Sequence, residues 1–261
     1  MKMTNYHTHT SRCKHAYGND EDYVLCAIAG GFEILGFSDH SPWKLHPFEG
    51  SFYRMEYEEL PGYLSSIKSL KAKYKNEITI LLSLEAEYFP DRLKWLKSIK
   101  EKHLDYLVFG NHYHRYITFD TYYGHYSGGL QELVDLYLQD SYDALKSGLY
   151  EVFAHPDIFL SNFPTINKFA VSALEKLCLW SKEFSVPLEY NLAGLTGHGS
   201  YPSDKLFKLA AQYQAPVIVN GDCHSPQALL ASSFFQDKKK MLRDWGCEVV
   251  DDLMEYIKLK S

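Results

Sequence analysis

The sequence has few cysteines, and their spacing does not suit a disulfide framework. Five cysteines, an odd number, are scattered over 261 residues without a C-x-x-C pair. Small secreted domains depend on disulfides because they cannot bury enough apolar surface. This chain is long enough, with 46% hydrophobic residues, to bury a large core without them. We therefore expect reduced thiols and an intracellular protein.

Long apolar segments are absent as well. No window approaches the roughly 18 uncharged apolar residues of a membrane-spanning helix, and the first residues lack the apolar stretch of a secretory signal. The net charge of -6 comes from interleaved acidic and basic residues, which disfavours a dedicated nucleic-acid binder. We expect a cytoplasmic protein that associates with neither membranes nor nucleic acids.

The sequence also lacks the motifs of the most common nucleotide-binding and serine hydrolase folds. It contains no G-x-G-x-x-G, no G-x-x-x-x-G-K-[ST] and no G-x-S-x-G. Internal repeats, low-complexity tracts and linkers rich in Gly, Pro and Ser are absent too. We therefore expect one domain that covers residues 1–261.

The chain does contain a regular alternation of short apolar runs and amphipathic segments. This alternation is typical of β-α units around a parallel sheet, and a barrel is the simplest such arrangement. The expected strands are residues 3–8, 34–38, 78–84, 105–110, 150–154, 186–191 and 216–220. The expected helices lie near residues 20–30, 56–74, 91–102, 130–147, 167–184 and 203–213.

Two local features add to this pattern. A long irregular segment, residues 111–129, is rich in aromatic residues and histidine, and segments of that length are often functional. The last predicted helix has a clear start, because Ser203 or Asp204 can cap its first turn.

Histidine and carboxylate side chains follow almost every predicted strand. The carboxyl ends of the strands of a β/α barrel converge on one face, where active sites are built. Each motif alone is weak, because H-x-H, D-H or H-P-D also occurs in ordinary turns. Their coincidence at strand ends indicates a metal site. The residues are His7, His9, Asp39, His40, Glu85, Glu87, His112, His114, His155, Asp157, Asp222 and His224.

The chemistry of these side chains suits Zn²⁺, Mn²⁺ or Fe²⁺. The candidates are too many for one ion, and a carboxylate such as Glu85 could bridge two. Neighbouring cations lower the pKa of a shared water and neutralise the oxygens of a phosphoester in the transition state. The pattern therefore favours metal-assisted hydrolysis over redox chemistry.

Two cysteines adjoin these histidines. Cys223 alternates with Asp222 and His224 on an extended segment, so its side chain should point to the opposite side. Cys13 belongs to a loop whose geometry cannot be read from the sequence. We interpret Cys13 as a neighbour of the site rather than a ligand.

Together the motifs resemble the polymerase and histidinol phosphatase (PHP) superfamily, and most of all its monofunctional histidinol-phosphatase branch. The segments that carry the resemblance are "YHTHTSRCKHA", "GFSDHSP", "LEAEY", "GNHYH", "FAHPD" and "GDCHS". They occur in order from residue 5 to about residue 226. The resemblance implies a distorted (β/α)7 TIM-like barrel. It also implies three divalent ions, Zn, Mn or Fe, at the C-terminal ends of the strands.

A ligand set follows from the resemblance. The first ion takes His7, His9, Glu85 and Asp222, the second shares Glu85 and adds His112 and His155, and the third takes His15, His40 and His224. His114 competes with His112 for the fourth-strand position, and we prefer His112 because it follows the glycine sooner.

The resemblance also implies a mechanism. A hydroxide that bridges the first two ions attacks phosphorus, and Asp222 or a metal-bound water protonates the leaving alkoxide. Glu85 and Asp222 are thus the expected catalytic residues. Asp39 is expected to orient a ligand histidine from outside the metal site.

The implied substrate is L-histidinol phosphate, which is hydrolysed to L-histidinol and phosphate in histidine biosynthesis. Relatives hold the phosphate with basic side chains after the fifth and sixth strands, but here those loops, "DIFLSNFP" and "NLAGLTGHGSYP", contain no arginine. Arginine is hard to replace in bidentate phosphate recognition. The residues that could take over are Arg12, Lys14, Arg115 and His198, with Lys44 as a further candidate.

The missing arginines leave two alternatives. The chain could use the same metals on another small phosphoester, such as a nucleotide or a sugar phosphate. It could also be a non-catalytic metal-binding module, although every expected ligand is present. For an enzyme, we expect a small phosphorylated substrate and a monomer or small homo-oligomer.

Overall fold

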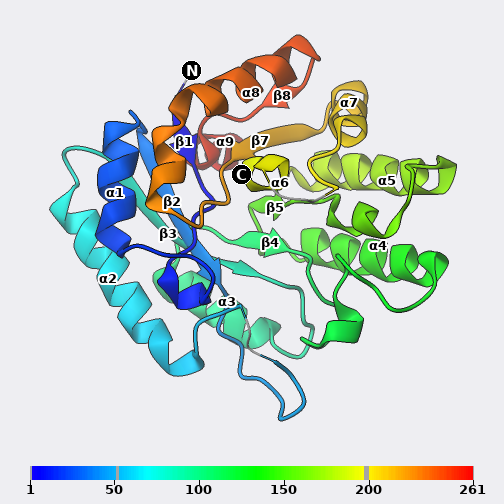
Figure 1. The fold of residues 1–261 in the computed structure, drawn as a ribbon, viewed down its shortest axis with the longest axis horizontal. Helices are drawn as coiled ribbons and strands as arrows, with labels where there is room; N and C mark the ends of the chain where they lie inside the picture. The colour runs from blue at the N-terminus through cyan, green and yellow to red at the C-terminus, as the bar shows by residue number, and fades with distance from the viewer. Residues whose placement is uncertain (1, 51–52, 197–199, 261) are drawn as a thin grey trace.

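A parallel sheet organises the computed structural model, which describes residues 2–50, 53–196 and 200–260. Its eight strands are hydrogen-bonded in the order in which they occur in the chain (Figure 1). A connection between parallel neighbours must cross back over the sheet, and helices make these crossings. The strands are β1 (Thr4–Asn5), β2 (Ile34–His40), β3 (Thr79–Ala86), β4 (Val108–Gly110), β5 (Val152–Ala154), β6 (Leu188–Asn191), β7 (Pro216–Asn220) and β8 (Glu248–Val249).

The chain segments that follow β1 and β7 join the sheet to itself. Thr8 forms a parallel bridge with Cys223. The His9 amide donates to the Cys223 carbonyl at 2.9 Å, and the Cys223 amide donates to the His7 carbonyl at 3.1 Å. These bonds curl β1 to β7 into a distorted barrel, which confirms the predicted fold. The sequence analysis missed β8 because it has only 2 residues, and it extends the sheet from the start of β7.

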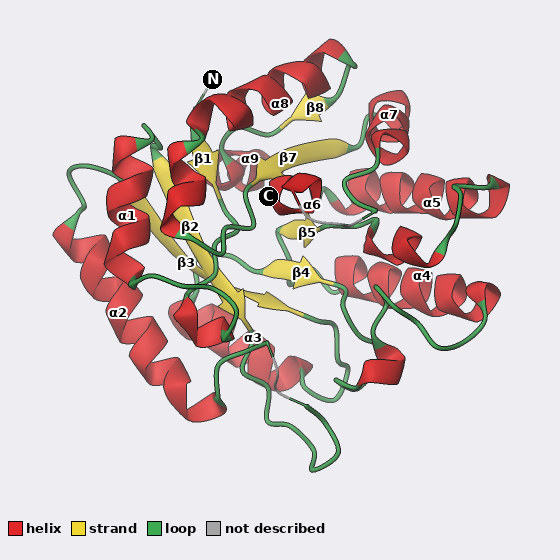
Figure 2. Cartoon of the chain, viewed as in Figure 1, coloured by secondary structure: helices red, strands yellow, loops and turns green. Residues whose placement is uncertain are grey.

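Helices cover the outside of the barrel (Figure 2). Every predicted helix is confirmed to within a few residues. The sequence analysis did not predict α6, α8 and α9. α6 is short, and α8 has many charged residues and few buried ones. α9 lies beyond the last predicted strand and buries one residue. The helices are α1 (Asp20–Ala29), α2 (Leu60–Lys73), α3 (Leu93–His103), α4 (Leu130–Lys146), α5 (Lys168–Phe184), α6 (Leu192–Thr196), α7 (Asp204–Tyr213), α8 (Ser232–Asp244) and α9 (Leu253–Lys260).

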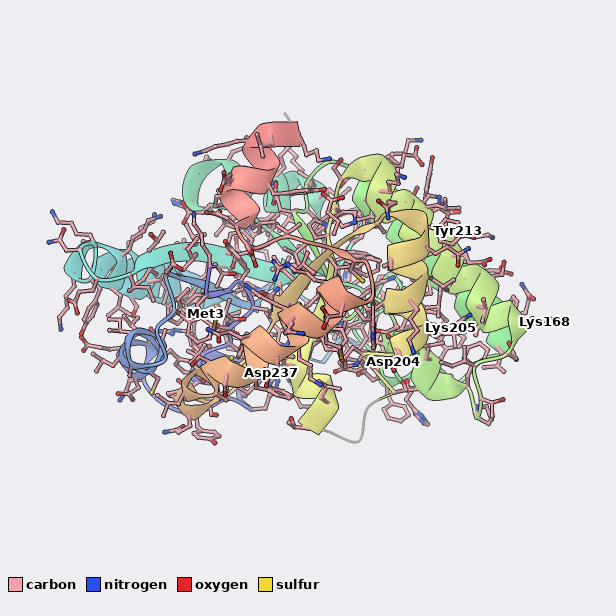
Figure 3. All side chains as sticks on the ribbon, turned by 90° about the horizontal axis from the view of Figure 1, so that it is seen from above. Met3, Lys168, Asp204, Lys205, Tyr213 and Asp237 are labelled. Atoms are coloured by element: carbon pink, nitrogen blue, oxygen red, sulfur yellow. The ribbon has the colours of Figure 1, made fainter. Side chains whose placement is uncertain are left out.

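Apolar side chains fill the amino-terminal end of the barrel. Leu253, the first residue of α9, is fully buried there, and its amide donates to the Tyr6 hydroxyl at 3.0 Å. Figure 3 shows α9 and α6 on opposite sides of the barrel. Because α6 follows the carboxyl end of β6, α9 closes the other end. The interior cluster consists of Tyr6, Ile34, Leu81, Tyr106, Val108, Val152, Ala154, Ile218 and Leu253.

Gly36 in β2 makes room for this interior packing. A Cβ at Gly36 would lie 2.0 Å from the hydroxyl oxygen of Tyr106. The Tyr106 hydroxyl occupies that space and donates to the Tyr6 carbonyl at 2.5 Å. A side chain at position 36 would therefore displace the ring that joins β1 to β4.

The outer core lies between the strands and the helices, as the packing of α7 illustrates. Asp204 and Tyr213 are labelled at the two ends of α7, and Lys168 is labelled at the start of the neighbouring α5 (Figure 3). The Ser203 hydroxyl accepts a hydrogen bond from the Leu206 amide, so Ser203 is the predicted N-cap.

Among the described residues, we find no helix with the length and apolarity that crossing a membrane requires.

Candidate metal centre

The metal ligands expected from the sequence come together at the carboxyl end of the barrel. His40 and Glu85 lie at the ends of β2 and β3, and His15 follows a short 3-10 helix, η1 (Ser11–Cys13). The other ligands lie in the segments directly after β1, β4, β5 and β7. Parallel strands therefore deliver side chains that are distant in the sequence to one face.

Glu85 lies at the centre of this cluster and is buried. Its Oε2 atom is 3.3 Å from His7 Nε2 and 3.4 Å from His9 Nε2. Its Oε1 atom is 3.0 Å from His155 Nε2 and 3.3 Å from His112 Nε2. His40 Nδ1 is also 3.0 Å from Oε2. Oε2 thus faces three imidazoles, and Oε1 faces two others. A carboxylate that bridges two metal ions needs this arrangement.

Asp222 completes one side of the cluster. Its Oδ1 atom is 3.1 Å from His9 Nε2 and 3.5 Å from His7 Nε2. Asp222 has a φ of 48° and His155 has a φ of 31°. Non-glycine residues seldom adopt positive φ, and such strain persists only where the surrounding structure enforces it. Both residues lie at strand ends and both point into the cluster.

Several buried atoms of the cluster have no hydrogen-bond partner among the described residues. They include Glu85 Oε2, Asp222 Oδ1, His9 Nδ1 and His224 Nε2. Leaving one buried polar atom unpaired costs about 1–3 kcal/mol. Divalent cations would satisfy these lone pairs, and the mixture of imidazole and carboxylate donors fits Zn²⁺, Mn²⁺ or Fe²⁺. The residues present therefore fit a metal centre.

The candidate ligand atoms divide into overlapping groups, each with all atoms within 4.8 Å of one another. These groups do not follow the expected ligand set in every detail. They are His7, His9 and Glu85; His40, Glu85 and His112; His9, His40 and His224; His9, Cys13 and Asp39; and Cys13, His15 and His224. The Cys13 sulfur is among these candidate atoms, and its interpretation as a neighbour rather than a ligand stays a prediction.

The inner part of the cluster is strongly coupled electrostatically. Burial alone would raise the pKa of Glu85, but His112 and His7 outweigh it and hold this pKa well below its usual value. Burial alone would lower the pKa of His7, but Glu189 and Asp222 raise it well above the usual value. Nearby carboxylates also outweigh burial at His9 and His112 and raise the pKa of each to about 9. Without metal, these three imidazoles therefore hold protons. A metal ion must displace these protons when it binds.

The pKa values of His40 and His224 are shifted in the opposite direction. Burial lowers the pKa of His40 to about 3, and the neighbouring His9 adds to this effect. Burial and His9 also lower the pKa of His224 to about 4. These two imidazoles are neutral at physiological pH and offer a lone pair without proton loss.

Glu189 in β6 is a buried partner of the site that the sequence analysis missed. Its Oε1 atom lies 2.8 Å from His7 Nδ1, and its Oε2 atom accepts from the His155 amide at 3.1 Å. The contact with Nδ1 leaves His7 Nε2 free to face Glu85. A glutamate inside a predicted buried strand was the available signal, because buried carboxylates require partners.

Glu87 and Arg54 support His112 in the same way. Glu87 Oε1 lies 3.2 Å from His112 Nδ1, and Arg54 Nη2 donates to Glu87 Oε1 at 2.9 Å. Trp43 Nε1 donates to Glu87 Oε2 at 2.7 Å. Arg54 is buried and gave no signal in the sequence, because it lies in a long loop far from any strand end.

His114 is directed away from the cluster. Its Nδ1 atom lies 2.9 Å from Asp140 Oδ2, and the Tyr123 hydroxyl donates to the same oxygen at 2.6 Å. His112 instead faces Glu85. Gly110 allows this orientation, because a Cβ there would lie 2.4 Å from Glu85 Oε1 and 2.6 Å from His112 Cε1.

Asp39 lies beside the cluster. It accepts hydrogen bonds from the Thr10 hydroxyl and from the Thr10 amide, the latter at 3.2 Å. Its Oδ1 atom is 3.6 Å from His9 Nδ1. This position is compatible with the expected role of Asp39 in orienting a ligand histidine.

Two of the basic residues expected to recognise phosphate form ion pairs with carboxylates outside the cluster. Arg12 Nη1 donates to Asp20 Oδ1 at 2.7 Å, and Lys14 pairs with Glu56. Arg115 is exposed in the loop that carries His112. His198 lies outside the described residues.

Two tyrosines that the sequence analysis did not single out border the cluster. The Tyr201 ring centroid lies 5.6 Å from that of His155. Tyr53, which is exposed, packs edge-on against His15 at 5.2 Å. Aromatic side chains are thus available beside the ligands.

The fold and the site together define an α/β barrel with a buried histidine and carboxylate centre suited to divalent metals. The chain matches the PHP domain family over residues 5–191, and it belongs to that family. This match ends with β6, so Asp222 and His224 lie beyond it.

Similar proteins cover nearly the whole chain. A Deinococcus radiodurans protein named "Probable histidinol-phosphatase" is 28% identical over 256 residues, which cover 94% of this chain and 94% of that protein. The histidinol-phosphatase of Bacillus subtilis (strain 168) is 25% identical over 255 residues, covering 86% of this chain and 94% of that protein. The crystal structure of histidinol phosphate phosphatase from Lactococcus lactis subsp. lactis Il1403, complexed with zinc, L-histidinol and phosphate, covers 95% of both chains with a TM-score of 0.72 and 18% identity. This last likeness shows the fold.

Proposed function

We propose that this chain is a metal-dependent phosphomonoesterase that hydrolyses L-histidinol phosphate to L-histidinol and phosphate, a step of histidine biosynthesis. Membership of the PHP domain family supports the proposal, as do the names of the relatives from Deinococcus radiodurans and Bacillus subtilis. The Lactococcus lactis structure, with zinc, L-histidinol and phosphate, supports the same substrate.

The position of Glu85, whose two oxygens face different imidazoles, carries the proposal. His7, His9 and Asp222 would hold one ion with Glu85, and His112 and His155 would hold a second ion with it. A third ion would be held by His15, His40 and His224. Bound at these positions, divalent ions activate water near neutral pH and neutralise the oxygens of a phosphoester.

Asp222 is the residue that we expect to move the proton that hydrolysis requires. Burial alone would raise its pKa, but His7 and His224 hold the pKa well below the usual value, so Asp222 is a carboxylate. Asn191 Nδ2 donates to its Oδ2 atom at 3.1 Å and fixes the group in place. The carboxylate can accept the proton of the attacking water and return it to the leaving alkoxide of histidinol.

We propose that substrate recognition in this chain does not depend on arginine after β5 and β6, because the sequence has none there. Arg12 is paired with Asp20, so we propose that the ions themselves make the principal contacts to the phosphate. Lys14 likewise pairs with Glu56, so Arg115 and His198 stay the candidates for an additional contact. Tyr201 beside His155 offers an aromatic surface for the imidazole ring of the substrate.

A phosphate-release assay with metal analysis of the same preparation tests the proposal. We expect hydrolysis that is lost on chelation and restored by Zn²⁺, Mn²⁺ or Fe²⁺. The kcat/KM for histidinol phosphate should exceed that for nucleoside monophosphates and sugar phosphates at least about tenfold, which corresponds to about 1.4 kcal/mol of transition-state discrimination. Equal values across this panel would favour another small phosphoester. Bound metal without phosphate release would favour a non-catalytic module.

A matched pair of variants assigns the activity to the site. Asp222→Asn removes the proton acceptor and should abolish turnover while the far-UV circular dichroism spectrum is retained. Asp237→Asn changes an exposed aspartate of α8 (Figure 3) and should leave kcat/KM unchanged.

A further inference from the structure

The phosphate group of a substrate needs hydrogen-bond donors as well as metal ions, and the basic side chains near the centre supply few. The segments after β5 and β6 contain no arginine, and Arg12 and Lys14 are paired with carboxylates. A phenol also donates a hydrogen bond, and tyrosine is abundant in this chain. Two tyrosines, Tyr122 and Tyr201, are placed to act as such donors.

Tyr201 is held against the metal centre from two sides. Its ring centroid lies 5.6 Å from that of His155. Behind the ring lies Gly194 of α6, where a Cβ would be 2.6 Å from Tyr201 Cδ2. Two residues further on, the Ser203 amide donates to Asp157 Oδ2 at 2.6 Å and ties this segment to the turn after β5. The Tyr201 side chain is therefore fixed beside an expected metal ligand.

Tyr122 reaches the centre from the loop after β4. It forms an antiparallel bridge with Tyr113, and the two ring centroids are 5.4 Å apart. The next residue, Tyr123, donates its amide to the His112 carbonyl at 2.7 Å. A Cβ at Gly124 would lie 2.6 Å from the Tyr122 hydroxyl oxygen, so the ring occupies the space above this glycine. Tyr122 is thus attached to the loop that carries His112.

The hydroxyl groups of both tyrosines face the carboxylates of the centre. Burial raises the pKa of Tyr201, and Asp222, Tyr122 and Glu85 raise it further. Burial also raises the pKa of Tyr122, and Glu85 adds to this effect. A carboxylate acts on a phenol in this way only when the two groups are close. The two hydroxyls therefore lie near Glu85 and near each other, although they come from different loops.

These hydroxyls differ from those of the core tyrosines. The buried Tyr63 and Tyr137 each donate to a backbone carbonyl at 2.9 Å. The hydroxyls of Tyr122 and Tyr201 have no hydrogen-bond partner among the described residues. Both side chains are partly exposed, so a ligand can reach them. A phenol near neutral pH is protonated, and the two groups are therefore free donors beside the metal centre.

We propose that the hydroxyls of Tyr122 and Tyr201 donate hydrogen bonds to the phosphoryl oxygens of the substrate. This inference rests on the phosphomonoesterase of the proposed function and adds how it recognises phosphate without arginine. Hydrogen bonds to anionic oxygens are stronger than those between neutral groups, and two donors from separate loops also orient the phosphate. The Tyr201 ring stays available to the imidazole of the substrate, because only its hydroxyl contacts the phosphate.

Phenylalanine variants of the metal-loaded enzyme test the hydroxyls and keep the rings. Tyr122→Phe and Tyr201→Phe should each weaken inhibition by inorganic phosphate about tenfold and lower kcat/KM for p-nitrophenyl phosphate by a similar factor. The metal content, measured by elemental analysis, should equal that of the wild type. Tyr116→Phe is the matched control, because Tyr116 belongs to the same loop as Tyr122 but is 40% exposed, and it should change neither quantity.

Two outcomes of this comparison would overturn the proposal. One is unchanged inhibition by phosphate in both variants. The other is a loss of bound metal that accounts for the weaker inhibition, because the tyrosines would then support the metal centre rather than contact phosphate.

A crystal structure of the wild-type, metal-loaded enzyme with inorganic phosphate guards against variants that do not fold. We expect both phenolic oxygens within about 2.5–3.0 Å of phosphate oxygens. Phosphate held by the ions without either hydroxyl would overturn the proposal. These readouts use phosphate and p-nitrophenyl phosphate, so they are independent of the natural substrate. Weaker phosphate inhibition in the variants of an enzyme without preference for histidinol phosphate would overturn the proposed substrate and leave the tyrosine assignment intact.

Discussion

The two ends of the barrel are built from the same strands but have opposite chemistry. At the amino-terminal end, Tyr6, Ile34 and Leu253 belong to an apolar interior cluster that α9 closes. At the carboxyl-terminal end, Glu85 and Asp222 are surrounded by imidazoles, and several buried atoms have no partner among the described residues. Apolar packing stabilises one end, and the unpaired polar atoms at the other end are suited to binding metal ions.

This difference separates stability from function along a single strand. β1 and the residues after it show the change, because Tyr6 packs in the interior while His7 and His9 face Glu85. Apolar burial stabilises the fold without any ligand. Buried ionisable groups contribute little net stability and are retained for what they bind. Mutations at the two ends should therefore have separable effects.

The largest expected effect is at the carboxyl-terminal end. His112→Ala should lower kcat/KM by more than about 100-fold, beyond the range of changes outside a ligand shell. His114→Ala, a change two residues away in the same loop, should lower it by less than about tenfold, because His114 contacts Asp140. Steady-state kinetics at saturating metal make the comparison. A larger loss in His114→Ala would reverse the ligand assignment.

The largest expected loss of stability is at the amino-terminal end. Leu253→Ala should reduce the free energy of unfolding by about 2–5 kcal/mol, because it opens a cavity in the barrel interior. Leu259→Ala in the same helix is the control, since Leu259 is 78% exposed and should change stability by less than about 0.5 kcal/mol. Urea denaturation measures both. Activity at low temperature should be unchanged, and a loss of turnover in folded Leu253→Ala would show that the two ends are coupled.

Glu189 gives an intermediate effect. Glu189→Gln keeps the shape of the side chain but removes the charge that faces His7 Nδ1. We expect metal affinity or activity to fall about 10–100-fold, measured by competition with a chelator. Glu101→Gln changes an exposed glutamate of α3 and should have no effect. Unchanged metal affinity in Glu189→Gln would remove its role in positioning His7.

The smallest expected effect comes from the cap of α7. Ser203→Ala removes the hydroxyl that accepts from Leu206 and should reduce the free energy of unfolding by about 1 kcal/mol. Ser203→Thr keeps the hydroxyl and should retain stability. The Ser203 amide donates to Asp157 Oδ2 at 2.6 Å, and this bond is kept in both variants. Thermal unfolding compares the variants, and equal midpoints would show that the cap contributes nothing.

Much of the fold could be predicted because its signals are local. The apolar run at β3 is buried along almost its whole length, and the helical period at α7 begins at a serine cap. β8 and α6 escaped prediction because short elements contain too few residues to establish a period. α8 escaped because its charged residues obscure the few that it buries.

The candidate site was predictable to the extent that strand ends determine it. His7, His9 and Glu85 occupy positions that a parallel barrel brings together regardless of detail. The partners of these ligands were harder to predict. Glu189 lies within a strand and Arg54 lies in a loop, and neither position implies contact with a histidine.

The order of residues determined which side chains each strand presents at its end, because side chains alternate along a strand and parallel strands share a direction. The sequence was therefore sufficient for the barrel and for the meeting of the expected ligand side chains at one end of it. The three-dimensional fold determined that the two oxygens of Glu85 face different imidazoles and that His114 turns to Asp140. It also determined that the Cys13 sulfur lies within 4.8 Å of His15 and His224. These outcomes depend on loop conformation and on contacts between distant segments. The motif "HTSRCKH" contains the residues, but only the turn at Lys14 places the thiol.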